Sequence, residues 1–310
     1  MRHFCLLINL CFLFAIGTSA SNLLRSDDAV DSTAYRATAK DATPTIYDGY
    51  LLVWHDEFDE DGLPSDEWTC EQGFQRNEEL QWYQSNNATV SGGCLVIEGR
   101  KEQVENPNYV AGSGNWKHNR KYAEYTSSSL TTQNSFAFHY GRIEVRAKIP
   151  TAKGSWPAIW LLGDKWEWPN NGEVDILEYY IKNGCPSILA NACWGDKERW
   201  KAVWNESVTP FSHFNAKDKD WAEKFHVWHM DWDESLMSIY VDDELVNRID
   251  LSITYNMGYD GNHENPFTSS EMKHYILLNL AIGGNGGTPD LQSFPLEYYV
   301  DYVRVYQKKM

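Results

Sequence analysis

The sequence predicts an all-β protein, built as a sandwich or a barrel. Short runs rich in Val, Ile, Trp and Tyr alternate with turn residues from residue 50 onward in the 310-residue chain. No stretch of the sequence carries the sustained 3.6-residue apolar period of a long amphipathic helix, and no internal repeat is visible. Many short strands with little helix are typical of sandwiches and barrels, in which each strand buries one face against a second layer.

The first 49 residues are expected to lie outside the folded domain. A basic start precedes an apolar run at residues 4–16, and small residues allow cleavage after Ala20, which predicts a signal peptide over residues 1–20. The run is too short to span a membrane, so no membrane insertion is expected and the protein is predicted to be secreted or periplasmic. Residues 21–49 are polar and predict a flexible linker, followed by one domain over residues 50–310.

Within this domain, β-prone runs between turns predict the strands in order. Apolar and charged residues alternate from Arg142 to Ile149, the pattern of an antiparallel strand with one face in the core and one in water. Residues 156–162 are almost wholly apolar and predict a buried strand. Further strands are expected at residues 51–54, 81–83, 88–90, 94–98, 127–132, 173–178, 188–194, 225–232, 236–246, 275–282 and 298–306. Loops are expected at residues 102–125, 197–224 (with room for a helical turn) and 256–273.

Three acids, Glu173, Asp175 and Glu178, stand close together among apolar residues. Apolar and acidic residues alternate from Glu173 to Ile176, so Glu173 and Asp175 are expected on the same face of a strand. Glu178 has the wrong parity for that face, because it lies five positions after Glu173. A β-bulge around Ile176 or Leu177 would restore it, and bulges are common beside active sites.

This acidic strand suggests catalysis. Acids are poor strand formers, and like charges on one face repel each other. Crowding separates the pKa values of neighbouring carboxyl groups, which leaves one protonated and one ionised at neutral pH. A carboxylic acid and a carboxylate on either side of one bond are the groups that hydrolyse glycosides. The alternative is a solvated strand that merely carries negative side chains.

Composition favours a neutral carbohydrate as the ligand. Aromatic residues make up 14% of the chain, with 14 Trp and 18 Tyr, and flat rings stack on the apolar faces of sugars, although large sandwiches also bury aromatic residues in their cores. The formal net charge of −17 disfavours nucleic acid, anionic membranes and sulfated polymers as partners.

Four cysteines remain once the predicted signal peptide is removed. In an exported protein they permit two disulfides in three connectivities. Cys185 and Cys193 are close enough in sequence to bridge a hairpin, and Cys70 with Cys94 is the complementary pair. Four free thiols are the alternative, and no spacing resembles a zinc site.

Nearly the whole mature chain, from residue 51 to residue 306, carries segments of one known family in order. The most specific is Glu173–Glu178, which matches a Glu-x-Asp-x-x-Glu signature that includes the extra residue of a bulge. Supporting segments are residues 54–58, 77–83, 141–148, 156–160, 168–169, 225–232, 278–284 and 300–306. On these segments the chain resembles glycoside hydrolase family 16, in its laminarinase-like β-glucanase branch.

The resemblance implies a jelly-roll sandwich of two antiparallel sheets with a concave substrate cleft. It implies an endo-acting enzyme, expected to be monomeric, that hydrolyses neutral β-1,3- or mixed-linkage β-1,3-1,4-glucan with retention, by double displacement. Glu173 is then expected to be the nucleophile and Glu178 the general acid and base. Asp175 is expected to lie between them and to hold Glu173 by hydrogen bonding.

The resemblance also implies substrate contacts. Trp160 and Trp168 match aromatic residues beside the cleavage site, and Trp156 is expected to add a further platform. Asn77 and Arg142 match polar groups that hold sugar hydroxyls. Each has a structural alternative, because Trp is common in sandwich cores and Arg142 fits a solvated strand face.

No cofactor is expected for the chemistry, but the family has a structural calcium site. Here it would match the Asp301 side chain with the main-chain carbonyls of Glu57 and Gly93. One carboxylate among carbonyls is a modest ligand set for calcium. The sequence departs from the family at Cys193, where many relatives carry His, which puts any His-assisted role at Asp175 in doubt.

Other functions remain open on the sequence. A hydrolase of agar-type galactan would use the same fold and acids. A non-catalytic β-glucan-binding protein is a second alternative, although such proteins usually lose one or more of the acids, and all three are present here. A metal hydrolase is a third, but His226 and His229 lie three apart on a predicted strand, which places them on opposite faces.

Overall fold

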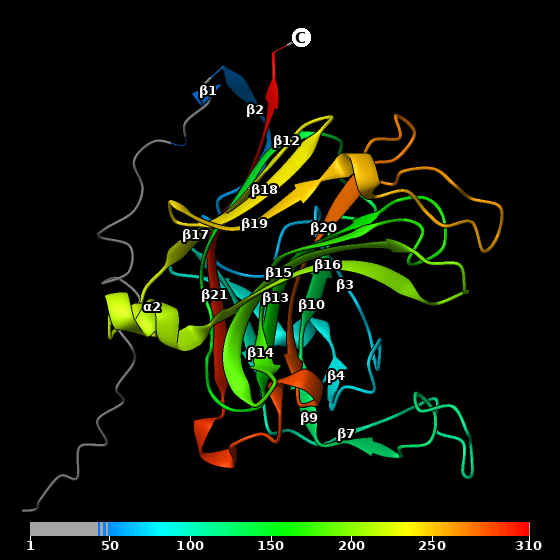
Figure 1. Cartoon of the computed structure of the whole chain (residues 1–310). Helices are drawn as coiled ribbons and strands as arrows, with labels where there is room; N and C mark the ends of the chain where they lie inside the picture. The colour runs from blue at the N-terminus through cyan, green and yellow to red at the C-terminus, as the bar shows by residue number, and fades with distance from the viewer. Residues whose placement is uncertain (1–42, 44–45, 48, 310) are drawn as a thin grey trace, which may run out of the picture.

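The computed structural model describes residues 43, 46–47 and 49–309, which form two large antiparallel sheets packed face to face (Figure 1). The sheet that carries the acids has the strand order β16 (Ala202–Pro210), β15 (Cys185–Gly195), β14 (Glu173–Lys182), β13 (Ser155–Gly163), β20 (His274–Ile282), β10 (Ser129–Thr131) and β3 (Thr69–Cys70), and β11 (Ala137–Phe138) also pairs with β20. The other sheet has the order β1 (Ile46–Tyr47), β2 (Tyr50–Asp56), β21 (Leu296–Lys308), β12 (Gly141–Lys148), β17 (His226–Trp232), β18 (Leu236–Val241) and β19 (Glu244–Asp250). In the second sheet, β6 (Cys94–Gly99) also pairs with β21, and β5 (Ala88–Ser91) pairs with β6.

The remaining elements are short and connect or cover the sheets. Two small strand pairs are β4 (Gln81–Tyr83) with β9 (Tyr125–Ser127) and β7 (Val104–Glu105) with β8 (Tyr122–Ala123). The helical elements are α2 (Phe211–Lys217), η1 (Ser85–Asn87), η2 (Trp221–Glu223), η3 (Leu251–Ile253), η4 (Gly284–Gly286) and η5 (Leu291–Ser293). Within the described part of the chain, no helix combines the length and apolarity needed to cross a membrane.

One apolar core lies between the two sheets. Alternate residues of β12, including Ile143 and Val145, meet alternate residues of β13, including Ile159 and Leu161, and all four are fully buried. As the strict alternation of its sequence predicts, β12 turns its apolar face toward the core. The prediction of an all-β sandwich of two antiparallel sheets is confirmed.

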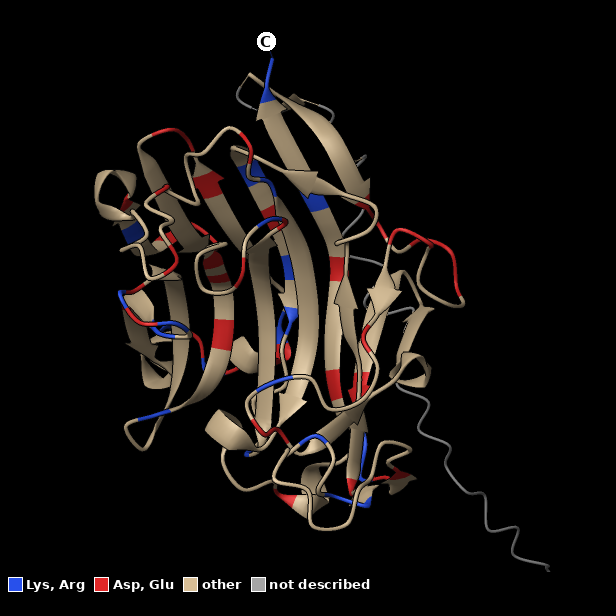
Figure 2. Cartoon of the chain, turned by 90° about the vertical axis from the view of Figure 1, so that its right-hand side faces the viewer, with Lys and Arg blue, Asp and Glu red and all other residues tan. Residues whose placement is uncertain are grey.

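Acidic positions outnumber basic ones and lie on strands of both sheets as well as in loops (Figure 2). The polar face of β12 is less exposed to solvent than its sequence suggests. Glu144 is buried there, and its Oε1 lies 2.7 Å from Arg142 Nε. Charged residues that point away from the core are thus paired with neighbours across the outer face of this sheet.

Three predicted segments differ from the structure. Residues 197–224 are not only a loop, since β16 forms the edge of the sheet that carries the acids, ahead of α2. This strand was missed because its inward positions include Asn205 and Ser207, so it lacks apolar alternation. Residues 236–246 contain two strands, β18 and β19, separated by a turn at Asp242 with φ of 53°. The loop at residues 102–125 carries the small β7–β8 hairpin.

The expected disulfides do not form. All four described cysteines are free. Cys185 and Cys193 lie on the same strand, β15, and a strand rises about 3.3 Å per residue, which separates them by roughly 26 Å. The alternative of free thiols is confirmed, but only Cys94 and Cys193 are buried, whereas Cys70 is partly exposed and Cys185 is exposed.

The predicted signal peptide at residues 1–20 lies outside the described residues, and so does most of the predicted linker at residues 21–49. Two linker residues, Ile46 and Tyr47, form β1, which pairs with β2. The sheet therefore begins a few residues before the expected start at residue 50.

A buried ion pair joins the start of the domain to its last strand. Arg304 donates from Nε and Nη2 to the two carboxylate oxygens of Glu57 at 2.9 and 2.8 Å, and both side chains are 8% exposed. We expect Glu57→Gln to lower the free energy of unfolding by about 3 kcal/mol, because it leaves a buried guanidinium without its counter-charge. Urea titration measures this. Glu124→Gln, at an exposed pair with Lys101, is the control and should leave the free energy of unfolding nearly unchanged; equal losses in the two variants would contradict the prediction.

Candidate active site

The predicted bulge is present in β14. Pairing with β13 places Asp175 opposite Trp160 and Leu177 opposite Ile159, so Ile176 is the extra residue. Ile176 and Leu177 are both fully buried in the core, although they are adjacent in sequence. Two consecutive inward residues reverse the face of the sheet to which each following residue of β14 points. The bulge around Ile176 or Leu177 is therefore confirmed.

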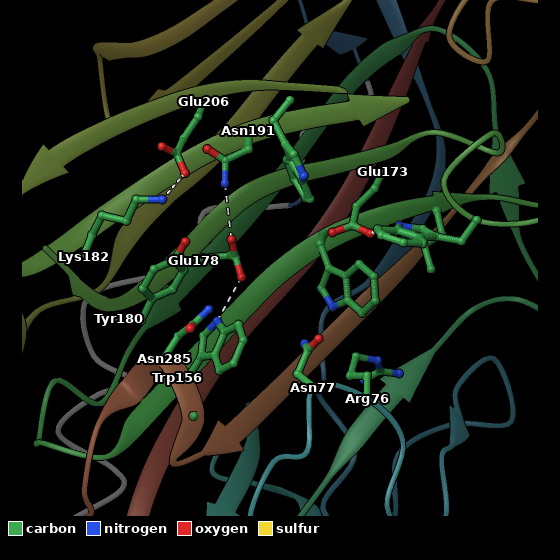
Figure 3. A pocket seen from close by; sticks show the side chains of 15 residues that line it. Arg76, Asn77, Trp156, Glu173, Glu178, Tyr180, Lys182, Asn191, Glu206 and Asn285 are labelled. Carbon is green, nitrogen blue, oxygen red and sulfur yellow. Dashed lines mark hydrogen bonds and ion pairs between the residues drawn. The ribbon is translucent and has the colours of Figure 1, made fainter. Parts of the chain in front are cut away.

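As a result, all three acids reach the same side of the sheet. Glu173 and Glu178 both line one cavity, and Asp175 lies between them with 2% of its surface exposed. Figure 3 shows Glu173 and Glu178 projecting into the same space from one strand. The partly exposed pair can contact a ligand, whereas Asp175 is placed to act on its two neighbours.

Glu178 is held from both sides. Trp156 on β13 donates from Nε1 to one carboxylate oxygen at 2.9 Å. Asn191 on β15 donates from Nδ2 to the other oxygen at 3.3 Å (Figure 3). The same Nδ2 also donates to Asp175 at 3.2 Å. The carboxyl group of Glu178 is thereby fixed in orientation by residues from both neighbouring strands.

Glu173 has its own indole donor. Trp168, in the loop between β13 and β14, donates from Nε1 to Glu173 Oε2 at 2.7 Å. A hydrogen bond from Asp175 also reaches Glu173 and lowers its pKa relative to burial alone. Asp175 donates because burial and the charges of Glu178 and Glu173 raise its pKa well above the usual range, which keeps it protonated at neutral pH.

The two accessible acids differ in their electrostatic surroundings. Burial, assisted by the charges of Glu173 and Glu79, raises the pKa of Glu178 to about 8. Burial also raises the pKa of Glu173, but hydrogen bonds from Trp168 and Asp175 and the charge of Arg76 act in the opposite direction. This arrangement favours a protonated Glu178 beside an ionised Glu173 at neutral pH, which is the pair that the sequence predicts.

The cavity around the acids measures about 770 Å³ and lies on the face of the sheet away from the core. It is lined by aromatic and polar side chains from several segments: Arg76, Asn77, Trp156, Trp160, Leu162, Trp168, Glu173, Glu178, Tyr180, Lys182, Asn191, Trp204, Glu206, Gly284 and Asn285. Flat rings with interspersed hydrogen-bonding groups suit a sugar chain.

Four of the five predicted substrate contacts lie in this lining, namely Asn77, Trp156, Trp160 and Trp168. The prediction for Arg142 is wrong. It lies on β12 in the other sheet and pairs there with Glu144 and Asp231, because the side chains on its face of the strand point away from the core.

The sequence did not predict the two cations of the lining, Lys182 and Arg76, and Arg76 lies next to the predicted Asn77. Its guanidinium pairs with Glu71 and lies over the Trp160 ring, 5.1 Å from the ring centroid. Asn77 adopts φ of 57°, which suggests a constrained turn at this edge of the cleft. The position of Arg76 directly before the supporting segment at residues 77–83 was the available signal.

A buried network supports the cleft wall from below. Glu79, 3% exposed, accepts hydrogen bonds from Asn77 at 3.2 Å and from the hydroxyl of Tyr83 at 3.3 Å. Tyr83 in turn accepts from Asn279 at 3.0 Å, and Asn279 accepts from Trp160 at 2.7 Å. One buried carboxylate thus orients both a polar and an aromatic wall residue of the cavity.

Cys193 occupies the position expected for His. It lies opposite Glu173 in the pairing of β14 with β15 and is fully buried. Burial raises the pKa of its thiol well above the usual range, so it stays neutral. In this chain, Asn191 rather than a residue at position 193 donates to Asp175.

The expected calcium ligands lie near one another, but the one carboxylate among them is already paired. On the side of β21 away from β12, β2 ends opposite Val303 and β6 begins opposite Val300, which places the backbone of Glu57 and Gly93 near Asp301. The Asp301 carboxylate, however, already accepts from Arg146 at 2.7 Å, and a cation would share it with that guanidinium. No group of three or more His, Cys, Asp or Glu side chains among the described residues is arranged to hold a metal. Calcium at this place stays a prediction.

Neither predicted-strand histidine belongs to a metal site. His226 contacts Asp242 at 2.8 Å and the Trp221 carbonyl at 2.9 Å, while His229 stacks on Tyr240. Both ring nitrogens of His226 have protein partners, and among the described residues neither histidine belongs to a group of three or more potential metal ligands.

Comparison with known proteins places this geometry in a family. The model of the glycosyl hydrolases family 16 matches residues 74–274. A β-glucanase from Rhodothermus marinus is 34% identical over 83% of this chain and 85% of its own length. Several other curated relatives are longer, and the chain spans between 34% and 49% of three of them.

Solved structures agree with this assignment. One comes from work on endo-acting O-glycanases that prominent members of the human gut microbiota express to initiate mucin breakdown; it has a TM-score of 0.76 and 36% identity, covering 86% of this chain and 94% of the other. A non-specific endo-β-1,3(4)-glucanase from family GH16 has a TM-score of 0.65 and 33% identity, covering 86% and 95%.

Proposed function

Because the chain belongs to glycoside hydrolase family 16, as its laminarinase-like segments predict, we propose that it is an endo-acting β-glucanase that cleaves β-1,3- or mixed-linkage β-1,3-1,4-glucan with retention. The observation that carries the proposal is the bulged strand β14, which presents Glu173 and Glu178 to one aromatic cavity with Asp175 between them. The similar β-glucanase and endo-β-1,3(4)-glucanase support glucan as the substrate class.

The proposed reaction has two steps. In the first, a Glu173 carboxylate oxygen attacks the anomeric carbon while the bond to the glycosidic oxygen breaks, and Glu178 gives its proton to that oxygen. In the second, Glu178, now ionised, takes a proton from water as the water oxygen attacks the anomeric carbon and releases Glu173. Two inversions at one carbon give net retention.

The surrounding groups fit these roles. Trp168 and protonated Asp175 donate hydrogen bonds to Glu173, which limits its basicity and orients it for attack. Trp156 and Asn191 hold Glu178 toward the cavity from either side. Positioning of this kind is a large part of catalysis, since it removes the entropy cost of bringing groups together.

The charge pattern of the cavity supports a neutral polymer. Its two cations, Arg76 and Lys182, each already pair with an acid, Glu71 and Glu206 respectively. A sulfated or carboxylated chain would meet Glu173 and Glu178 without a free cation to offset them. Export of the protein, expected from the apolar start of the sequence, is part of the proposal, because a polymeric glucan is met outside the cell.

A second candidate is an endo-acting O-glycanase. The structure from the mucin-breakdown work has a higher TM-score than the glucanase structure, 0.76 against 0.65, at similar coverage. The acids and the reaction would be the same, and only the sugars in the cleft would differ.

The proposal is tested by product analysis on four substrates: a β-1,3-glucan, a mixed-linkage β-glucan, agarose and mucin O-glycans. We expect short oligosaccharides from one or both glucans, with the new reducing ends first appearing as the β-anomer by proton NMR. The Glu173→Ala variant, which lacks the proposed nucleophile, is the negative control. Products from mucin O-glycans alone would favour the second candidate, products from agarose alone would move the substrate to galactan, and α-anomers would reject retention.

A further inference from the structure

Trp204 is a large aromatic residue that the core does not use. It lies on the edge strand β16 with 46% of its surface exposed, while its neighbour Val203 packs against the core. Its indole nevertheless contributes to the lining of the cavity that holds the acids. Exposed indole surface is unfavourable in water, and a partly open ring inside a cleft is therefore available for an apolar ligand face.

Strand pairing fixes where Trp204 lies relative to the acids. It is opposite Cys193 on β15, and Cys193 is opposite Glu173 on β14. Directly opposite residues point to the same face, so the three side chains form one row across the sheet. Neighbouring strands are about 4.8 Å apart, which places the backbone of Trp204 roughly 10 Å from that of Glu173. This separation corresponds to a site beyond the sugar that Glu173 attacks.

The residue between Trp204 and Glu173 in this row, Cys193, has a small and neutral side chain. Cys193 is fully buried, and its side chain is much shorter than the His that the family pattern suggests at this position. Cys193 does not itself line the cavity, but Trp204 and Glu173 on either side of it both do. The departure from the family pattern and the exposed indole therefore occur side by side in the same row.

Polar groups flank the indole on one side. Glu206 follows Trp204 by two residues on the same face of β16 and forms an ion pair with Lys182 of β14 (Figure 3). Both side chains are about one-third exposed and line the cavity. A carboxylate and an ammonium group held in fixed positions offer an acceptor and donors to sugar hydroxyls.

We propose that Trp204, with Glu206 and Lys182, forms a subsite for an additional neutral sugar unit on the β16 side of the catalytic acids. The inference rests on the proposed function, because it extends the same cleft. The sugar stacks its apolar face on the indole and directs its hydroxyls to the ion pair. Oligosaccharides long enough to reach β16 gain binding that shorter ones lack.

The test compares Trp204→Ala with Trp200→Ala across β-glucan oligosaccharides of three to eight units. Trp200 is a matched control, since it is 55% exposed on the connection that leads into β16 but absent from the cavity lining. We expect Trp204→Ala to lower kcat/KM roughly three- to tenfold for the longest oligosaccharides and to leave the shortest cleaved substrate unchanged. Trp204→Phe should recover most of the loss, and Trp200→Ala should match wild type at every length.

The outcomes separate this inference from the proposed function. Loss of the same factor at every chain length, or no loss at any length, in a Trp204→Ala protein that melts at the wild-type temperature rejects the subsite alone. An equal effect of Trp200→Ala rejects it as well. Failure of the wild-type protein to cleave any glucan oligosaccharide rejects the glucanase, and the glucan subsite with it.

Discussion

Replacing Glu173 by Ala is expected to lower kcat on a glucan by about 10⁴- to 10⁶-fold, the largest effect of any single change in this chain. The substitution removes the carboxyl group that lines the cavity together with Glu178 and is placed to attack, and neither Trp168 nor Asp175 can replace it, because both are donors to Glu173. The measurement is the initial rate of reducing-end formation on the substrate that the product analysis identifies.

Rescue by a small anion shows whether the missing group was a nucleophile. Azide can enter the space that the Glu173 side chain leaves and attack the anomeric carbon once, which gives a glycosyl azide of inverted configuration. We expect this product from Glu173→Ala with an activated aryl glycoside and none from wild type. The control is Asp231→Asn, which removes an acid that pairs with Arg142 on the other sheet and should retain wild-type activity. Activity of Glu173→Ala within tenfold of wild type would exclude the nucleophile role.

Replacing Glu178 by Gln is expected to lower kcat on a glucan by about 10²- to 10⁴-fold, the contribution typical of general acid–base catalysis. The amide retains the size of the side chain but has one acceptor oxygen, so Glu178→Gln removes the proton together with the hydrogen bond from either Trp156 or Asn191. With an aryl glycoside whose leaving group needs no proton, the first step should be nearly normal. Water activation then limits the second step, and stopped-flow measurements should show a burst of released phenol followed by slow turnover.

The pH dependence of kcat/KM tests the same assignment of Glu178 as the general acid. Glu178 must be protonated for the first step, and burial raises its pKa to about 8 in the free enzyme. We therefore expect wild-type kcat/KM to fall as the pH rises through about 8, and to fall on the acid side as Glu173 becomes protonated. In Glu178→Gln the alkaline decline should disappear while the acid decline remains. An alkaline decline that persists in this variant would assign it to another group.

Local pattern was sufficient to predict most of the strands and the acidic site. The alternation in β12 and the apolar run in β13 each depend on neighbours a few residues apart, and the structure confirms both. The same holds for the bulge at Ile176, which the parity of the acids required. By contrast, β16 has polar residues on its inward face, so its sequence carries no strand period.

Predictions that depended on distant contacts were less successful. Arg142 was assigned to the cleft by resemblance alone, yet the stacking of two sheets puts its strand in the layer that does not carry the acids. The disulfide between Cys185 and Cys193 failed because their sequence separation falls within one extended strand rather than across a turn. Neither outcome can be read from the local pattern, since both depend on which strands pair.

By itself, the sequence determined the fold class, the identity of the three acids and the need for a bulge, because these follow from side-chain periodicity along one segment. Only the tertiary structure decided which groups surround those acids. Trp156 and Asn191 reach Glu178 from β13 and β15, and Trp204 joins the cavity from the edge strand through pairing in register. Burial between these strands raises the pKa of Glu178, and burial is a property of the assembled sheet rather than of any single segment.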